Sequence, residues 1–150
     1  MTKTVFLLNG PNLNLLGERE PEVYGRETLA DIETRATAEA GRLGLLLDFR
    51  QTNHEGVLID WVHEAGKRAA GLIVNPGAYT HTSIALHDAL KAVRIPKIEL
   101  HLSNIHAREP FRRTSYVSPA VDALIAGLGS EGYLLALDAM NRLIDKSARK

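Results

Sequence analysis

The sequence predicts an α/β protein, a flavodoxin-like doubly wound domain built on a five-stranded parallel sheet. Five short apolar runs alternate along the chain with segments of helical character. Runs that are apolar throughout are typical of strands in a parallel sheet that helices cover on both faces. Right-handed crossover connections then favour the doubly wound arrangement. A length of 150 residues suits one domain, so we expect a single domain over residues 1–150.

The first expected strand, residues 5–9 ("VFLLN"), is followed by a long loop and then by a helix. Thr28 can cap this helix because Asp31 stands at its third position, and Gly44 is placed to end it. Similar signals predict the later elements. The other expected strands are residues 45–51, 71–75, 97–101 and 121–127, and the other expected helices are about residues 57–69, 82–93 and 130–144.

The composition is that of an ordinary globular protein, with 45% hydrophobic and 24% charged residues. Eighteen basic residues balance eighteen acidic ones, so no overall field favours nucleic acid or an anionic membrane as a partner. The chain has no cysteine, which excludes disulfides and thiolate metal sites and suits a reducing cytosol. Its N-terminal apolar run is too short for a signal peptide, and no stretch could span a bilayer. We therefore expect a soluble, cytoplasmic protein.

Polar side chains follow three of the expected strands at the point where each strand ends. The segments are "NGPN" (9–12), "NPGAYTH" (75–81) and "ELHLSN" (99–104). In doubly wound sheets, ligands bind outside the carboxyl ends of the strands. A purely structural edge has no need of so many hydrogen-bonding groups, so this edge is predicted to hold a ligand.

The signatures of several common enzyme classes are missing or misplaced. The segment "GLGSEG" (127–132) matches the glycine pattern of dinucleotide-binding turns, but it follows the last expected strand. We expect its glycines to serve tight packing between strand and helix. The sequence contains neither the H-E-x-x-H pattern of zinc proteases nor the G-x-S-x-G elbow of serine hydrolases. Metal hydrolase and serine hydrolase are therefore poor hypotheses.

Glu99 and His101 lie two residues apart on an expected strand, so their side chains point to the same side of the sheet. A carboxylate beside an imidazole fixes the orientation of the ring and favours its protonated form. That arrangement makes a general acid. A structural ion pair at a strand end is the alternative, and the spacing does not choose between the two.

Two further patterns have a possible ligand-binding interpretation. His81 and Asp88 are seven residues apart, two helical turns, so both can face one way. A helix-end cap and a solvated carboxylate explain them more simply. Arg108, Arg112 and Arg113 gather in the connection after the fourth expected strand. Planar guanidinium groups beside a binding edge favour an anionic ligand over a solvated loop.

The loop over residues 16–25 ("LGEREPEVYG") is long, and such loops are usually functional or disordered. It holds Arg19 and Tyr24 between Gly17 and Gly25. A phenol with its ordinary pKa of about 10 is a poor base at neutral pH, but nearby positive charge lowers that pKa. A loop that carries a base and its activating cation between two glycine hinges has the form of a catalytic lid. A tyrosine that anchors the loop by packing is the alternative.

Six segments taken together resemble type II dehydroquinase, the 3-dehydroquinate dehydratase of the shikimate and quinate pathways. They are "LNGPNLNLLGEREPEVYG", "NHEG", "NPGAYTHTS", "ELHLSN", "REPFRR" and "GYLLAL". The similarity covers essentially the whole chain in order. One departure is Thr114, which stands where several members carry histidine, at a position outside the family's catalytic set.

The resemblance implies a flavodoxin-like enzyme that needs no metal or cofactor. It implies removal of water from 3-dehydroquinate by anti elimination through an enolate. Tyr24 matches the base, and Arg19 matches the lid arginine that keeps this tyrosine ionised. Asn12 matches the residue that helps to hold a water at the enolate oxygen. His101, oriented by Glu99, matches the acid that protonates the departing hydroxyl.

The resemblance also implies a substrate-binding set and an assembly. Leu102 and Ser103 match the site for the substrate carboxylate. The residues that match those gripping the substrate hydroxyls are Asn75, His81, Asp88 and Arg112. Members form a homo-oligomer, a dodecamer built as a tetramer of trimers, in which the residue matching Asp88 reaches into the neighbouring subunit's site.

Three other functions are compatible with the expected fold. A sensor or binding domain is disfavoured because a pure binder has no use for an acid, a base and an activating arginine together. A flavin or nucleotide protein is disfavoured because the first loop lacks a phosphate cradle of small and hydroxyl residues. A phosphoacceptor receiver domain is disfavoured because the first strand ends in asparagines and lacks the acidic cluster that binds magnesium.

Overall fold

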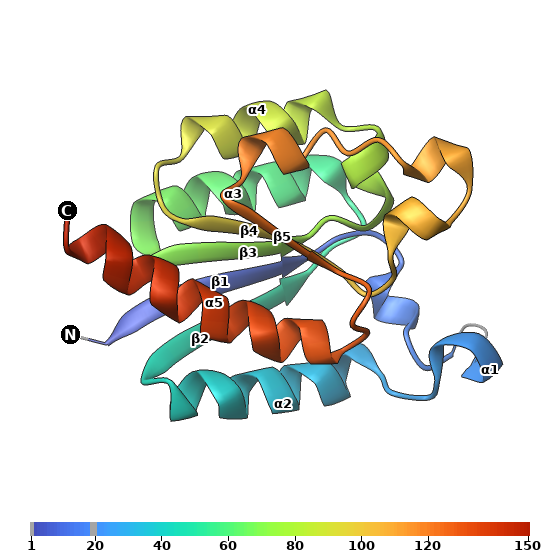
Figure 1. Ribbon diagram of the computed structural model, residues 1–150, viewed down its shortest axis with the longest axis horizontal. Helices are drawn as coiled ribbons and strands as arrows, with labels where there is room; N and C mark the ends of the chain where they lie inside the picture. The colour runs from blue at the N-terminus through green and yellow to red at the C-terminus, as the bar shows by residue number, and fades with distance from the viewer. Residues whose placement is uncertain (1, 19–20) are drawn as a thin grey trace.

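The structure is a computed structural model that describes residues 2–18 and 21–150. Its strands form one parallel sheet in the order β2-β1-β3-β4-β5 (Figure 1). This is the strand order of flavodoxin-like doubly wound proteins, so the predicted fold class is confirmed. The strands are β1 (Lys3–Asn9), β2 (Leu45–Gln51), β3 (Gly71–Asn75), β4 (Lys97–His101) and β5 (Ala123–Ala126).

Helices cover both faces of the sheet. Helices α2 (Leu29–Arg42) and α5 (Glu131–Ala148) lie on one face, and α3 (Glu55–Arg68) and α4 (Ile84–Ala92) lie on the other (Figure 1). Alternate residues of β1 serve the two layers: Leu7 packs toward α2 and α5, and Leu8 packs toward α3 and α4. Because both faces are buried, the central strands are apolar throughout, which is the pattern that predicted the fold.

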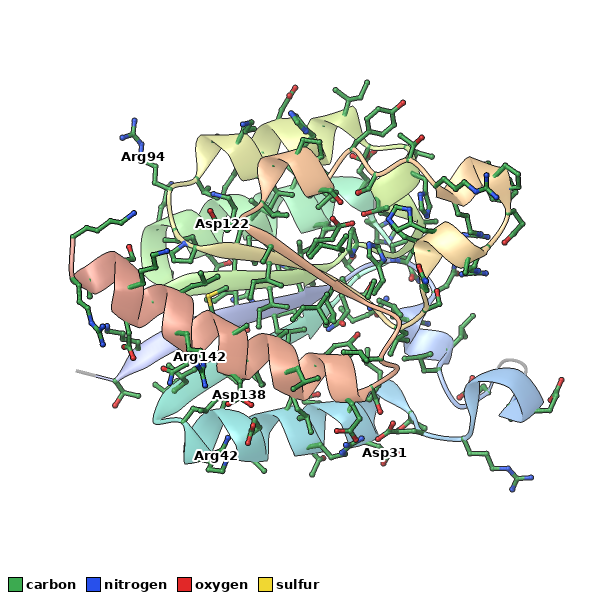
Figure 2. The ribbon with its side chains drawn as sticks, viewed as in Figure 1. Asp31, Arg42, Arg94, Asp122, Asp138 and Arg142 are labelled. Atoms are coloured by element: carbon green, nitrogen blue, oxygen red, sulfur yellow. The ribbon has the colours of Figure 1, made fainter. Side chains whose placement is uncertain are left out.

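Helix α2 begins and ends where the sequence predicts. The Thr28 hydroxyl accepts a hydrogen bond from the Asp31 amide at 3.1 Å, and the Asp31 carboxylate accepts one from the Thr28 amide at 3.0 Å. Gly44 follows the helix with a φ of 76°, a left-handed conformation that glycine adopts at little cost. On the solvent side, Arg42 reaches Asp138 of α5 at 3.2 Å and ties the two helices (Figure 2).

Several elements depart from their expected limits, and the structure gives a local reason for two of them. Helix α4 begins at Ile84, after the expected residue 82, because the Ser83 hydroxyl caps it by accepting from the Leu86 amide at 2.9 Å. Residues Gly77–His81 form a separate 3-10 helix, η2. The last strand is shorter than expected at both ends: the 3-10 helix η5 (Ser118–Ala120) and its C-cap Val121 precede it, and Gly127 ends it with a φ of 89°.

The glycines of the "GLGSEG" segment have packing and turn roles. Gly129 has a φ of 60°, which few residues with a side chain adopt. A Cβ on Gly132 would lie 3.1 Å from Leu100 Cδ1, so this glycine allows α5 to pack closely on β4. The close contact at Gly132 agrees with the packing interpretation of the motif, whereas Gly129 serves the turn.

Two connections at the carboxyl ends of the strands are long and contain short helices. Between β1 and α2 lie the 3-10 helix η1 (Leu13–Leu15) and the four-residue helix α1 (Pro21–Tyr24). Between β4 and β5 lie η3 (Ile105–Ala107), η4 (Pro110–Arg112) and η5 (Ser118–Ala120). Among the described residues, no helix combines the length and the apolar character that crossing a membrane requires.

Candidate active site

A cavity of about 230 Å³ opens at the carboxyl ends of β1, β3 and β4. It lies between the neighbouring parallel strands β1 and β3, where the strand order of the sheet reverses, the expected ligand position in this fold. Its walls combine apolar groups from η1 with polar groups that follow β3 and β4. Seven of the residues predicted from the sequence line it: Asn12, Asn75, His81, His101, Leu102, Ser103 and Arg112.

His101 and Glu99 form a buried pair behind this cavity. His101 Nε2 lies 2.6 Å from Glu99 Oε2, and the two residues are 5% and 0% exposed. The carboxylate therefore holds Nε2 and orients the ring. The other ring nitrogen, Nδ1, makes no hydrogen bond within the described residues and is left for the cavity that His101 lines. The ring therefore has one nitrogen held by Glu99 and one that stays unpaired within the described residues.

Three hydroxyl groups hold the Glu99 carboxylate from the other sides. Thr80 Oγ1 and Ser115 Oγ each donate to Glu99 Oε2 at 2.9 Å, and Ser118 Oγ donates to Oε1. Burial on its own raises the pKa of the Glu99 carboxyl, but the hydrogen bonds from His101 and Ser118 outweigh burial and hold the pKa below its usual range. These three hydroxyls could not be predicted from the sequence, because Thr80, Ser115 and Ser118 come from segments far from Glu99 in the chain.

Asn12 occupies an unusual backbone conformation at the cavity wall. Its φ is 69°, the one positive value for a non-glycine residue within residues 2–18 and 21–150. The side chain of Asn53 supports it, because Asn53 Oδ1 accepts from the Asn12 amide at 3.0 Å and from Gln51 Nε2 at 3.1 Å. Strained residues held by their surroundings are concentrated at functional sites. Asn53 belongs to the "NHEG" segment, to which the sequence analysis gave no role.

His81 lines the opposite wall from the end of η2. Its Nδ1 lies 2.7 Å from the backbone oxygen of Thr114. A carbonyl oxygen only accepts, so Nδ1 carries the proton, and Nε2 of the neutral ring is left as an acceptor. Thr114 acts here through its backbone, which any residue provides. The departure from the family's histidine at this position therefore leaves the contact intact.

The arginine cluster is only partly assembled at the cavity. Arg108 and Arg112 line it, whereas Arg113 is exposed. Arg108 Nη1 contacts Ser103 Oγ at 3.4 Å, and Arg112 Nε donates to both Glu109 carboxylate oxygens at 3.2 Å. Arg108 was noted in the sequence only as a member of the cluster. Its contact with Ser103 places a guanidinium group beside the expected carboxylate site.

Four other predicted site residues lie elsewhere or cannot be placed. Glu99 sits behind His101, outside the described cavity lining. Asp88 is exposed on α4 and away from that lining. His81 and Asp88 lie on different helices, because η2 ends at His81 and α4 starts only at Ile84. The prediction that helical spacing turns both the same way is therefore wrong. Arg19 lies outside the described residues, and of Tyr24 only the backbone, at the end of α1, is described.

No group of three or more histidine, aspartate or glutamate side chains gathers in a way that could hold a metal ion, across the part of the chain that the structure describes.

Comparisons with known proteins agree on one family. The family model for dehydroquinase class II matches residues 3–141. The chain is 58% identical over 147 residues to the 3-dehydroquinate dehydratase of Sinorhizobium medicae, with 98% of this chain and 99% of that protein covered. It is 64% identical over 141 residues to the 3-dehydroquinate dehydratase of a Chelativorans species, with 93% and 97% covered.

Solved structures give the same result. The type II dehydroquinase of Propionibacterium acnes superposes with a TM-score of 0.90 at 44% identity, covering 95% of this chain and 98% of that one. The type II dehydroquinase of Butyrivibrio crossotus also gives a TM-score of 0.90, at 40% identity, with 93% and 98% covered. With its fold, its cavity and its sequence in agreement, the chain belongs to the class II dehydroquinases, a family of hydro-lyase enzymes.

Proposed function

We propose that this protein dehydrates 3-dehydroquinate to 3-dehydroshikimate and water by anti elimination through an enolate. Its relatives named above are 3-dehydroquinate dehydratases. The observation that carries the proposal is the buried Glu99–His101 pair: the carboxylate holds Nε2 of a histidine that lines the cavity, and the other ring nitrogen makes no hydrogen bond within the described residues. Elimination beside a ketone needs a base, an acid on the opposite face and a stabiliser for the developing oxyanion.

His101 is the acid in this proposal. Protonation of the departing hydroxyl needs a positively charged or polarised N–H at the cavity surface, and Nδ1 of His101 is the available atom. Glu99 balances the charge of the protonated ring while remaining out of contact with the substrate. The three hydroxyls on Glu99 support this role because they favour its ionised form.

Tyr24 is the base, kept ionised by Arg19. The proposal rests on the match of both residues to the family motif and on the position of α1, in the connection that leaves the cavity wall after η1. The other tyrosines are poorly suited. Tyr79 donates its hydroxyl to the Asn53 backbone oxygen at 2.7 Å, Tyr133 is fully buried, and Tyr116 lies outside the described lining. Residues 16–25 then act as a lid that carries the base, Tyr24.

The remaining cavity residues bind the substrate. Asn12 helps to hold a water at the enolate oxygen, and the site at Leu102 and Ser103 takes the carboxylate, with Arg108 as an added cation beside Ser103. Asn75, His81 and Arg112 grip the ring hydroxyls. Every group required by the reaction is supplied by the chain, so the proposed mechanism uses no metal and no cofactor.

Asp88 has a different place in the proposal, because it lies on an exposed face of α4. We assign it to the cavity of a neighbouring subunit within a homo-oligomer, a dodecamer built as a tetramer of trimers. Ile84 supports this assignment: it stands one helical turn before Asp88 and is 60% exposed, an apolar side chain suited to contact with a partner. We place the enzyme in the cytoplasm, on the shikimate or quinate pathway.

The test is direct. Purified protein is mixed with 3-dehydroquinate in the presence and absence of a strong chelator, and the conjugated enone product is followed by its absorbance. We expect equal turnover in both samples. Turnover that chelator abolishes and added zinc or magnesium restores would contradict the mechanism. Binding of 3-dehydroquinate without any product would instead support a sensor domain on the same fold.

A further inference from the structure

A buried chain of hydrogen bonds crosses the carboxyl ends of three strands and ends at the cavity. Asn9 Nδ2, at the end of β1, donates to the backbone oxygen of Arg50 on β2 at 2.9 Å. Tyr133, from the first turn of α5, donates its hydroxyl to Asn9 Oδ1 at 2.7 Å. Asn75 Nδ2, at the end of β3, donates to the Tyr133 oxygen at 3.0 Å. We call this set the Asn9–Tyr133–Asn75 chain.

The two ends of this chain fix the direction of every hydrogen bond in it. The Arg50 carbonyl can only accept, so Asn9 must turn its Nδ2 toward Arg50 and its Oδ1 toward Tyr133. The Tyr133 hydroxyl then donates to Asn9 and has only lone pairs left for Asn75. At the far end, the Gly77 amide can only donate, and it bonds Asn75 Oδ1 at 3.2 Å. Both ends therefore impose the same orientation on the Asn75 amide.

Burial makes this orientation hard to reverse. Asn9, Tyr133 and Asn75 are 0%, 0% and 2% exposed, so a flipped amide would leave polar atoms unpaired away from water. Burial also raises the pKa of the Tyr133 phenol, which more than offsets the hydrogen bond from Asn75. The phenol therefore remains neutral at any working pH and keeps both its donor and its acceptor roles.

This orientation leaves one of the two N–H groups on Asn75 Nδ2 without a partner within the described residues. Nδ2 carries two hydrogens, and only one is engaged within the described residues. Asn75 lines the cavity, whereas Tyr133 is behind the wall and outside its described lining. The "GYLLAL" segment that contains Tyr133 was part of the family resemblance, but neither the sequence analysis nor the proposed mechanism gives this tyrosine a role.

We propose that Tyr133 is a positioning residue that locks Asn75 with its free N–H toward the cavity, so that the ligand group meeting Asn75 is a hydrogen-bond acceptor. The inference rests on the proposed function, since it assigns a lone pair of a substrate hydroxyl oxygen to this contact. Tyr133 acts only through Asn75 and does not touch the substrate. The specificity that follows is for an oxygen that accepts at this position.

A double-mutant cycle on kcat/KM tests the inference. Tyr133→Phe keeps the ring and removes the oxygen, so Asn75 Nδ2 loses its acceptor and, among the described residues, the Gly77 amide alone still orients the Asn75 side chain. We expect kcat/KM to fall about tenfold to hundredfold, the cost of one misaligned hydrogen bond. Asn75→Ala should cost at least as much, and the double variant should lose no more than Asn75→Ala alone. Additive losses, or an unchanged kcat/KM in a folded Tyr133→Phe variant, would overturn the proposal.

A stability-matched control separates positioning from general loosening of the core. Val62→Ala removes buried methyl groups from α3, in the layer on the other face of the sheet from α5. It should lower the melting temperature and leave kcat/KM unchanged at temperatures where the protein is folded. An equal loss of kcat/KM in Val62→Ala would show that instability, and not Asn75, carries the effect.

Hydrogen exchange of the wild-type Asn75 side-chain amide gives a second test that needs neither a variant nor turnover. With no ligand added, we expect one Nδ2 proton to be strongly protected and the other to exchange faster. Equal, rapid exchange of the two protons would overturn the inference. If wild type exchanges as expected but does not dehydrate 3-dehydroquinate, the proposed function fails while the Asn9–Tyr133–Asn75 chain stands.

Discussion

At the scale of single residues, the acid and its holder are expected to contribute unequally. His101→Ala removes the only group placed to protonate the departing hydroxyl in our proposal, and turnover should fall about 10²–10⁴-fold. Glu99→Gln keeps the shape of the side chain but replaces one carboxylate oxygen with an NH₂ group. That group would meet donors, because three hydroxyls and one ring nitrogen contact the carboxylate. We expect a weakened enzyme with an altered pH optimum and a lower melting temperature. Equal, small effects on kcat from both changes would favour a structural ion pair.

The proposed base gives a separate residue-scale prediction. Tyr24→Phe retains the ring and removes the ionisable oxygen, so kcat should fall about 10²–10⁴-fold while the melting temperature barely changes. Arg19→Ala should lower kcat as well, and should move the basic-side requirement of the pH–rate profile upward because the phenol loses its cation. Stopped-flow and steady-state rates across pH measure both effects. Near wild-type turnover in Tyr24→Phe would require another base.

At the scale of elements, an ion cluster joins the edge strand β2 to α3. The Arg50 guanidinium binds Asp48 at 2.8 Å and Glu64 at 2.8 Å, and it lies 4.6 Å from the Phe6 ring centroid and 5.4 Å from that of Trp61. Ion pairs together with contacts to aromatic rings hold the Arg50 guanidinium in position. The cluster therefore ties α3 to β2, the edge strand of the sheet within the described residues.

The cluster predicts how stability depends on pH. The hydrogen bonds from Arg50, with its charge, lower the pKa of the Glu64 carboxyl from 4.5 to about 2. A carboxyl whose pKa is lower in the folded state stabilises the fold above its unfolded pKa, and this contribution is lost as the pH falls toward the folded pKa. Glu64→Gln should therefore be less stable than wild type at neutral pH, and the two should converge between about pH 4.5 and about pH 2.

Urea midpoints measured across that pH range check the prediction. The matched control is Glu33→Gln, which alters an exposed carboxylate of α2 that makes no ion pair among the described residues. Its stability should run parallel to that of wild type. If the urea midpoint of Glu64→Gln also ran parallel to that of wild type across this pH range, the Arg50 cluster would contribute nothing to the free energy of unfolding.

Elements whose signals are local could be predicted from the sequence, and elements set by distant contacts could not. The Thr28 cap and the Gly44 stop define α2 within the helix and its flanks. The start of α4 was misplaced because it is set by the Ser83 cap and by the preceding η2, which ends at His81 and separates the two helices. The same holds at the site. The Glu99–His101 contact follows from strand alternation, whereas Asn53 under Asn12 and Tyr133 behind Asn75 depend on the packing of remote segments.

At the scale of the whole molecule, the cavity sits on one end of the sheet and Asp88 lies outside it, so one subunit leaves a member of the expected binding set unused. The chain has no net charge, so copies can associate without strong mutual repulsion. Closed symmetric assemblies are the common outcome for such chains. On α4, Asp88 is exposed one helical turn after the exposed Ile84, which agrees with the proposed contact with a second copy.

We therefore predict that the protein elutes as a large homo-oligomer and that Asp88→Arg weakens both its assembly and its activity. The new guanidinium would bring a further positive charge toward a cavity that Arg108 and Arg112 already line, so kcat/KM should fall at least about tenfold, which corresponds to roughly 1.4 kcal/mol. Asp145→Arg, an equal charge reversal at an exposed position near the end of α5, should change neither. Light scattering at the assay concentration measures the mass. A fully active monomer would rule out a shared site, and it would leave the roles proposed for Tyr24 and His101 untouched, because both groups belong to a single subunit.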